Sequence, residues 1–431
     1  MIFPKDSLFA FVALAISLQA AASPILQSRS PQGVSVPLPK RSGLRSDDGV
    51  FDLNKAVARM VRTQNKHTQN LLNFQANTGS LPFEGAKINE FLSLSKMLDL
   101  EDALGKRQSE SLTNENDIEW LGSITIGSNN QQFMIDFDTG STDFWVPSSA
   151  CTDSTCATKH LYDAANSTTS KAQDGNFSIH YGDGSTASGI LYTDTVTVAG
   201  VTVHDQYFAA VGNLSQTFGG DPIDGILGLA FPSLSKTGHD PFFTAANSQG
   251  AVQSNQFSFY LADENSELYL GGTNSDHYTG DFENYDVVKD KGYWTLGDAS
   301  VSVNGQNVVT GAKTIIDSGT SIIYGPPAAV KELYGKVEGN GTYDEARGLY
   351  SYPCKNPPKI TFNWGGKEWE ISGDNLNLGA ASNTGNICVG SIAAQDLGLG
   401  DNVWLLGDVF MRNVYSTFNF GTNQIGFAQL K

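Results

Sequence analysis

The sequence has few basic residues and no long hydrophobic run, and each of these two shortages excludes a class of protein. Its 431 residues include 4 Cys and 5 Met, and 27 Lys and Arg stand against 45 Asp and Glu, a net charge of −18. So acidic a chain is a poor partner for the phosphate backbone of nucleic acids. The apolar run at residues 8 to 18 is too short to span a bilayer about 30 Å thick as a helix. We therefore expect no nucleic-acid partner and no membrane anchor.

The first 22 residues have the pattern of a secretory signal peptide. One Lys at position 5 precedes the apolar run, and small residues at positions 20 to 23 offer a cleavage site. The sequence therefore predicts a signal peptide over residues 1–22 and a secreted, extracellular protein. The vacuole is the alternative destination, because the chain carries no address that decides between them.

The charge changes sign within the chain. Residues 23–107 hold 12 basic and 8 acidic residues, a net of +4, whereas residues 108–431 hold 14 and 36, a net of −22. The change falls at the dibasic pair Lys106-Arg107, which looks like a processing site for a kexin-type protease. Lys40-Arg41 is a weaker candidate. We predict a prosegment over residues 23–107 and a mature chain that begins at Gln108.

The four cysteines all follow Arg107, and an even number in a secreted chain indicates disulfides, with three pairings open in principle. Cys151 and Cys156 are five residues apart, which favours a local loop and leaves Cys354 with Cys388. N-x-Ser/Thr sequons, which predict glycosylation, stand at Asn166, Asn176, Asn213 and Asn340.

The histidines give no indication of a metal site. None of them has a Cys or His partner at ligand spacing, so we expect ordinary surface or structural residues and no metal. The six are His67, His160, His180, His204, His239 and His277.

Short apolar or alternating runs between clusters of Gly, Asn, Asp and Ser predict a mostly β protein. The clearest runs cover residues 118–126, 133–137, 189–198, 257–261 and 267–270. Helix-compatible stretches are few, and the best are residues 54–72 and 328–337.

Two segments of the chain resemble each other. Residues 137–142 read Phe-Asp-Thr-Gly-Ser-Thr, and residues 316–321 read Ile-Asp-Ser-Gly-Thr-Ser. An apolar-apolar-Gly triplet ends 90 residues after the aspartate in each case, at Gly228 after Asp138 and at Gly407 after Asp317. The sequence therefore predicts two related β lobes in tandem.

The repeat suggests a chemistry if the two lobes pack about a pseudo-twofold axis, because Asp138 and Asp317 then face each other. Two carboxylates about 3 Å apart share one proton and titrate with two separated pKa values. Such a pair can serve as base and acid together, activating water against a peptide carbonyl without a cofactor or metal.

The sequence lacks the motifs of two other kinds of site, that of a serine hydrolase and that of a dinucleotide-binding protein. The glycine-rich segments at 182–189 and 319–325 contain no G-x-S-x-G for a serine hydrolase, and Gly182-x-Gly184 lacks the third glycine of a dinucleotide site.

In these residues the chain resembles the pepsin-like aspartic endopeptidases, most closely the secreted fungal ones, from about residue 118 to residue 428. The segments that carry the resemblance are residues 137–141, 144–148, 181–185, 224–230, 317–321 and 404–410. The resemblance implies a bilobal, mostly β acid protease fold with a central cleft, its N-terminal lobe over residues 108–280 and its C-terminal lobe over residues 281–431.

The resemblance also implies roles for individual residues. Asp138 and Asp317 would be the catalytic dyad, supported by Thr139, Gly140, Ser141, Ser318, Gly319 and Thr320. The family often has Thr where this chain has Ser318, a mild departure. Tyr181, Gly182 and Asp183 would lie on a flap over the substrate, and Trp145 would hold the tyrosine by a hydrogen bond.

Asp136 lies two residues before Asp138, so a strand period of 2 points both side chains to one face. In similar fungal enzymes acidic residues here and at Asp183 let the first pocket accept Lys as well as bulky apolar residues. We expect the same preference. The alternative is that Asp136 only supports the dyad.

The charge split then predicts autoinhibition, in which the basic prosegment docks over the acidic cleft at neutral pH and leaves in acid. Lys40 and Lys106 are guesses for the lysine that reaches the dyad. The expected partners are protein and peptide substrates, the prosegment itself and pepstatin-type inhibitors, and we expect a monomer without cofactor. A catalytically silent binding glycoprotein is the alternative from another class, although both Asp motifs are intact.

Overall fold

The computed structural model describes residues 33–431 except 40–43, 47, 95–96, 98–119, 181–185, 215–217, 219–221, 290, 339–341, 346 and 383–384. Residues Gly33–Lys431 form one compact unit. Several predictions lie outside the described residues: the signal peptide, both dibasic pairs, the flap residues Tyr181, Gly182 and Asp183, and the sequon at Asn340.

The protein is mostly β, and its first large sheet builds the N-terminal lobe. The order of this seven-stranded sheet is β2-β3-β8-β4-β7-β6-β5, and β2 also pairs with β6. Its strands are β2 (Leu121–Ile126), β3 (Gln131–Asp138), β4 (Phe144–Pro147), β5 (Lys171–His180), β6 (Thr186–Val198), β7 (Val201–Asn213) and β8 (Gly225–Gly228). Strand β8 runs parallel to β3 and antiparallel to β4. All its residues are buried, which explains why its sequence shows no polar alternation.

The C-terminal lobe repeats this arrangement. Its seven-stranded sheet has the order β18-β17-β12-β13-β22-β14-β21, in which β22 runs parallel to β13 and antiparallel to β14. Its strands are β12 (Thr295–Val303), β13 (Gln306–Ile316), β14 (Ile323–Gly325), β17 (Ile360–Asn363), β18 (Trp369–Ile371), β21 (Ile392–Ala394) and β22 (Val403–Leu406). A four-stranded sheet adds β15 (Thr342–Asp344), β16 (Leu349–Pro353), β19 (Asn377–Ala380) and β20 (Ile387–Gly390).

A six-stranded sheet of order β1-β10-β9-β23-β24-β11 joins the two halves of the chain. Its strands are β1 (Val34–Pro37), β9 (Gln256–Tyr260), β10 (Glu267–Leu270), β11 (Tyr278–Asp286), β23 (Tyr415–Asn419) and β24 (Gln424–Leu430). Aromatic side chains from both halves form the core at this sheet, where the ring of Trp294 lies 5.9 Å from that of Phe257 and 5.3 Å from that of Phe418. The expected boundary at residues 280 and 281 falls inside β11 and stays a prediction.

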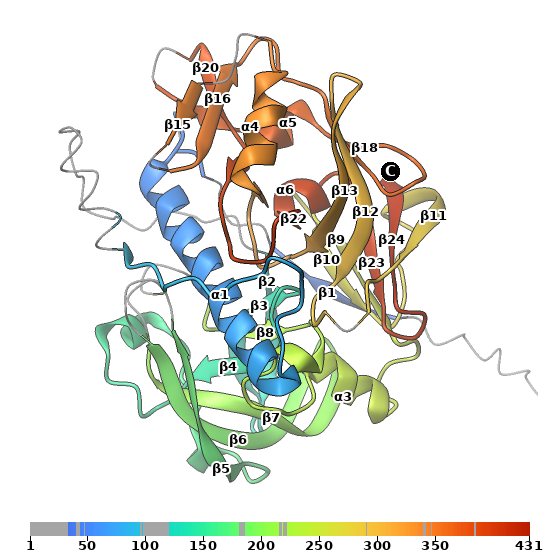
Figure 1. The fold of residues 1–431 in the computed structure, drawn as a ribbon. Coiled ribbons are helices and arrows are strands. Elements are labelled where there is room, and N and C mark those ends of the chain that lie inside the picture. Colours follow the sequence, from blue (N-terminus) through green and yellow to red (C-terminus); the bar gives the residue numbers. More distant parts are fainter. Residues whose placement is uncertain are drawn as a thin grey trace, which may run out of the picture. The chain divides into compact units, whose positions relative to one another are not determined.

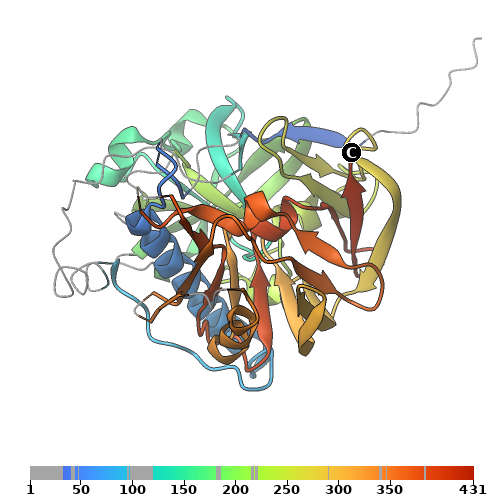
Figure 2. The ribbon, with the colours of Figure 1, turned by 90° about the horizontal axis from the view of Figure 1, so that it is seen from above.

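The helices among the described residues are few, and the longest of them lies between the lobes. They are α1 (Leu53–Thr78), α3 (Phe242–Ser248), α4 (Pro327–Gly335), α5 (Gly373–Leu376) and α6 (Asp408–Met411), with the 3₁₀ turns η1 (Ser154–Thr158), η2 (Ala164–Asn166) and η4 (Pro232–Leu234). Figures 1 and 2 show α1 between the strands of the N-terminal lobe and those of the C-terminal lobe. Helix α1 covers the predicted stretch 54–72. Helix α4 begins one residue before the predicted stretch 328–337 and ends at Gly335, two residues short of its end.

Helix α1 begins and ends with clear caps. The side chain of Asp52 accepts a hydrogen bond from the backbone N–H of Lys55, and Gly79 takes the left-handed conformation (φ 81°) that ends the helix. Many polar residues in the middle of the helix are nevertheless buried, among them Asn65, His67 and Asn70. Because polar side chains are buried only where they find partners, this burial indicates a polar surface opposite the helix.

The cysteines pair as the sequence indicated, Cys151 with Cys156 and Cys354 with Cys388. The sequon residues Asn166, Asn176 and Asn213 are exposed to solvent, as a glycosylated asparagine must be. In the described part of the chain, no helix has the length and apolar character needed to cross a membrane.

Candidate active site

The repeated Asp-(Thr/Ser)-Gly segments lie at the ends of equivalent strands. Asp138 ends β3 and pairs in register with Gly228 of β8. In the second lobe, Asp317 follows β13, and its backbone N–H donates to the carbonyl of Leu406 in β22. The equal interval of 90 residues therefore sets each apolar-apolar-Gly strand directly beside the aspartate of its own lobe.

The two turns meet across the boundary between the lobes, and their glycines permit the approach. A Cβ atom at Gly140 would overlap the carboxyl group of Asp317, and one at Gly319 would overlap the carboxyl group of Asp138. Each turn therefore needs glycine because the aspartate of the other lobe occupies the space of a side chain. The structure thus brings Asp138 and Asp317 together, as the repeat predicted.

Thr139 and Ser318 tie the two turns to each other. The backbone N–H of Thr139 donates to Ser318 Oγ (3.0 Å), and that of Ser318 donates to Thr139 Oγ1 (2.9 Å). Each hydroxyl in turn donates to a carbonyl of the opposite lobe, Thr139 to Ile316 (2.9 Å) and Ser318 to Phe137 (2.6 Å). Ser318 thus supplies the same hydroxyl that threonine would supply for these reciprocal hydrogen bonds. The methyl group by which threonine differs from serine takes part in none of them.

Each carboxylate is further held by the N–H of the glycine two residues later and by the hydroxyl three residues later. The donors to Asp138 are Gly140 N (2.8 Å) and Ser141 Oγ (2.5 Å), and those to Asp317 are Gly319 N (3.0 Å) and Thr320 Oγ1 (2.9 Å). Both aspartates are almost fully buried, at 1% and 0% exposure. Hydrogen bonds to a carboxylate favour its ionised form.

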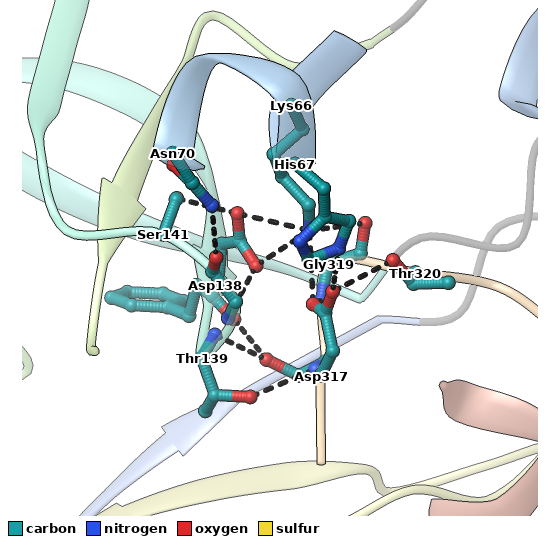
Figure 3. Close-up of polar contacts among 12 residues, drawn as sticks. Lys66, His67, Asn70, Asp138, Thr139, Ser141, Asp317, Gly319 and Thr320 are labelled. Carbon is teal, nitrogen blue, oxygen red and sulfur yellow. Dashed lines mark hydrogen bonds and ion pairs between the residues drawn. The ribbon is translucent and has the colours of Figure 1, made fainter. Parts of the chain in front are cut away.

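Helix α1 inserts a cation between the two carboxylates, as Figure 3 shows. The Nζ atom of Lys66 lies 3.1 Å from Asp138 Oδ1 and 2.9 Å from Asp317 Oδ1, and it also donates to the carbonyl of Gly319 (3.2 Å). The guesses Lys40 and Lys106 were wrong for this position and lie outside the described residues. Lys66 could not be chosen from sequence because the helix had no known place along the cleft.

His67 needs a correction as well. We expected an ordinary surface or structural histidine, but its Nε2 lies 3.1 Å from Asp317 Oδ2 and its side chain is fully buried. Its ring packs against Tyr293, with centroids 5.6 Å apart. The Nδ1 atom is buried without a hydrogen-bond partner among the described residues. His67 therefore belongs to the contact between α1 and the aspartates.

These surroundings make the two carboxyl groups unequal. Burial raises the pKa of Asp138 to about 6, although the charge of Lys66 opposes the shift. Burial acts in the same direction on Asp317, but there the charge of Lys66 and the hydrogen bond from His67 prevail and hold its pKa below the ordinary value. The pKa of Lys66 is raised, because the charges of both aspartates outweigh its burial. The pKa of His67 is lowered, mainly by burial.

A sequence signal for this contact exists in the spacing of basic residues. Arg59, Arg62 and Lys66 are three and four residues apart, which places them on one face of a helix. That face meets the aspartates. Asn70, one turn further on, donates from Nδ2 to the carbonyl of Gly140 (2.8 Å).

Asp136 lies beside Asp138 in a pocket, as the strand period predicted. The N-terminal lobe contributes Asp136, Trp145, Ile179 and Ile226 to this pocket, and α1 lines its other side, with Arg62 among its residues. Trp145 is buried against the ring of Phe218, with centroids 5.2 Å apart. Its expected bond to Tyr181 stays a prediction because Tyr181 lies outside the described residues.

No cluster of three or more His, Cys, Asp or Glu residues that could hold a metal ion is found among the described residues.

Comparison with known proteins supports one family throughout. The family described as "Eukaryotic aspartyl protease" matches residues 119–430. An aspartic protease of Phaffia rhodozyma is 38% identical over 436 aligned residues, which cover 99% of this chain and 99% of that protein. Cathepsin D of Clupea harengus is 36% identical over 74% of this chain and 83% of its own length. Pepsin A of Bos taurus is 32% identical over 80% of this chain and 94% of its own.

The matched region contains both Asp turns and the strands that carry them, and the Phaffia relative also spans the segment that holds α1. The chain belongs to the eukaryotic aspartyl protease family, of the pepsin-like kind, and is an aspartic-type endopeptidase.

Proposed function

We propose that this endopeptidase hydrolyses peptide bonds in acid with a water molecule bound between Asp138 and Asp317. The observation that carries the proposal is the position of Lys66 Nζ, within 3.1 Å of one carboxyl group and 2.9 Å of the other. Because one small group reaches both carboxyl groups there, a single water can bind both of them once α1 has left.

The proposed reaction uses the two aspartates as base and acid. The ionised carboxylate takes a proton from the water as the water oxygen attacks the carbonyl carbon, and the protonated carboxyl group donates a hydrogen bond to the carbonyl oxygen. The tetrahedral intermediate then loses its C–N bond, and the carboxyl group that received the proton passes it to the leaving nitrogen. Two carboxyl groups this close share one proton, which the reaction requires.

The proposal includes a precursor that is inactive at neutral pH. Helix α1 lies where a substrate must bind, with Lys66 between the aspartates and Asn70 bound to the carbonyl of Gly140. Cleavage after Lys106-Arg107 and protonation of carboxyl groups in acid would together release the helix. The predicted signal peptide directs this precursor to secretion, with the vacuole as the alternative, and the mature protein is expected to be a glycosylated monomer.

The proposed substrates are proteins with bulky apolar residues at the cleavage site, with Lys tolerated before the scissile bond. The pocket beside Asp138 supports both preferences, because Trp145, Ile179 and Ile226 are apolar and Asp136 adds a carboxyl group. Asp183 would assist Asp136 from the flap. Unchanged cleavage after Lys in an Asp183→Ser variant would contradict that part of the proposal.

The proposal is tested by hydrolysis of denatured haemoglobin by the processed protein across pH 2 to 8. Activity in acid that is lost with pepstatin and with Asp138→Asn supports the dyad mechanism. An exposed matched control is Asp205→Asn, because Asp205 pairs only with Lys171 on the surface in the described structure. No acid activity in a correctly processed chain, or full activity of Asp138→Asn, would overturn the proposal.

A further inference from the structure

Helix α1 makes another polar contact with residues 120–431, at Arg59, seven residues before Lys66. Arg59 donates from Nη1 to Ser321 Oγ (2.7 Å), and the residue is only 8% exposed. The pocket around it is lined by Asp136 of β3, by Ser321 and by Asp408, the first residue of α6. A buried guanidinium thus faces two carboxyl groups that come from different lobes.

Asp408 is the unusual member of this pocket. It is 2% exposed, and its Oδ1 atom is buried without a hydrogen-bond partner among the described residues. Buried carboxyl oxygens are normally satisfied, because an unsatisfied one loses its hydration and gains nothing in return. The proposed dyad chemistry makes no use of this group, so the burial of Asp408 calls for a ligand.

The charges around Asp408 indicate the kind of ligand. Burial raises its pKa well above the ordinary value, and Asp136 and Asp317 add to the shift, whereas Arg59 and Arg412 oppose it. Of the two arginines, Arg412 directs Nη2 to Asp263 at 2.6 Å, and Arg59 belongs to α1. When α1 leaves, the pocket therefore loses a cation and keeps its carboxyl groups.

We propose that Asp136, Asp408 and Ser321 form a subsite that binds one cationic side chain of the substrate, preferably that of arginine, and that Arg59 fills this subsite in the precursor. The inference rests on the proposed function, because it requires α1 to leave and a peptide to take its place. Arginine suits the site better than lysine, since a planar guanidinium can donate to two carboxyl groups and a hydroxyl at once.

The distance between Arg59 and Lys66 along α1 indicates how far the arginine of the substrate lies from the scissile bond. Arg59 and Lys66 are seven residues apart, which is about 10 Å along a helix that rises 1.5 Å per residue. An extended peptide covers about 3.3 Å per residue. The cationic side chain therefore lies roughly two to four residues from the scissile bond. Asp136 lines both this subsite and the pocket directly beside Asp138, whereas Asp408 and Ser321 line the subsite and are not among the lining residues of that pocket.

The test compares arginine with citrulline, which has nearly the same shape and no charge. A peptide with an apolar cleavage site carries one or the other at each position up to four residues on either side, and kcat/KM is measured with the processed enzyme. We expect the arginine peptide to be cleaved at least tenfold better at one position two to four residues from the cleaved bond. Asp408→Asn and Asp136→Asn should each bring that ratio close to one.

The measured quantity is the ratio of kcat/KM for the arginine peptide to kcat/KM for the citrulline peptide within one variant. A general loss of activity in that variant lowers both values and leaves their ratio unchanged. Asp205→Asn, at an exposed site, should leave the ratio as in the unaltered protein. The ratio should also increase with pH, because ionisation of the subsite carboxyl groups strengthens their attraction for arginine and not for citrulline. A lysine peptide should fall between the two.

Three results would overturn the inference. If the arginine and citrulline peptides are cleaved equally at every position, the enzyme has no such subsite. The proposed function is unaffected by that result, because both peptides are still cleaved. A clear arginine preference that persists in both Asp408→Asn and Asp136→Asn assigns it to other residues. Failure to cleave either peptide at any acid pH overturns the proposed function and this inference with it.

Discussion

The two Asp turns have nearly the same internal bonds and yet differ in electrostatics. Each aspartate accepts from the glycine two residues later and from a hydroxyl three residues later. Only Asp317 also contacts His67, and its pKa is lowered, whereas burial raises that of Asp138 to about 6. The difference teaches that the symmetry of the lobes belongs to the duplicated fold, and that α1, which has no counterpart among the described residues of the second lobe, breaks it.

The largest expected effect comes from removing either carboxyl group. Asp138→Asn and Asp317→Asn should each lower kcat/KM of the processed enzyme by about 10²–10⁴-fold or more, because general acid–base catalysis needs both partners. Similar losses would show that the aspartates are equivalent once α1 has left. A variant that retained more than a tenth of the activity would contradict the dyad.

The next effect concerns the cation that both turns share. Lys66→Met leaves two buried carboxylates without their counter-charge, and breaking such a pair costs about 3–5 kcal/mol. We expect the uncleaved precursor to lose its inhibition and to cleave a peptide at pH values where the unaltered precursor does not. Lys87→Met is the control, because Lys87 pairs with Asp396 on the surface. Unchanged inhibition in Lys66→Met would refute the role of Lys66.

Removing one hydroxyl from each turn should have a smaller effect. Ser141→Ala removes a hydrogen bond to the ionised form of Asp138, and a bond to a charged group is worth roughly 1.5–3 kcal/mol. Loss of that bond raises the carboxyl pKa, so the acidic limb of the pH profile should move to higher pH while kcat/KM falls about tenfold. Thr320→Val should give a similar change if the turns are equivalent in the mature enzyme. If kcat/KM falls in only one of these two variants, the two Asp turns are not equivalent in the mature enzyme.

The smallest effect should come from His67, the residue that distinguishes Asp317. Its pKa is lowered with α1 in place, so the released helix binds a proton more readily and release becomes easier as the pH falls below about 6.5. The charge of Lys66 lowers the pKa of both carboxyl groups, and the hydrogen bond from His67 lowers that of Asp317 further. Because Lys66 and His67 leave with α1, the carboxyl groups then bind protons more readily, and they also favour release as the pH falls. His67→Gln removes one of these contributions and should move the midpoint of activation by about half to one pH unit towards acid. An unchanged midpoint in a stopped-flow activation assay would exclude His67 from the pH response.

The strands and the repeat were predictable because their signals are local. The run predicted at residues 267–270 forms β10 with the same bounds. The 90-residue interval between Asp138 and Gly228 corresponds to the pairing of these two residues where β3 lies beside β8. Asp136 was placed beside Asp138 by the period of a strand alone. Such predictions need only the pleat of a strand and the duplication of a motif.

Lys66 and Asp408 could not be found in this way. The basic residues at positions 59, 62 and 66 define a helical face, but the position of the helix along the cleft depends on packing. That packing includes contacts such as Asn65 with the backbone of Leu92, and Asn73 with the carbonyl of Leu234. Asp408 stands in the segment 404–410 that carries the family resemblance, but the resemblance assigned it no role, and nothing local shows that its carboxyl group is buried.

The sequence by itself determined the duplicated turns, the two aspartates, the acidic body and the basic segment before it, because each is written in composition, spacing or a short motif. The tertiary structure alone decided which cation stands between the aspartates, which histidine joins it, and which carboxyl groups face Arg59. The physical reason is that helical periodicity fixes only the face of α1, whereas its position along the cleft depends on contacts between residues that are far apart in the chain.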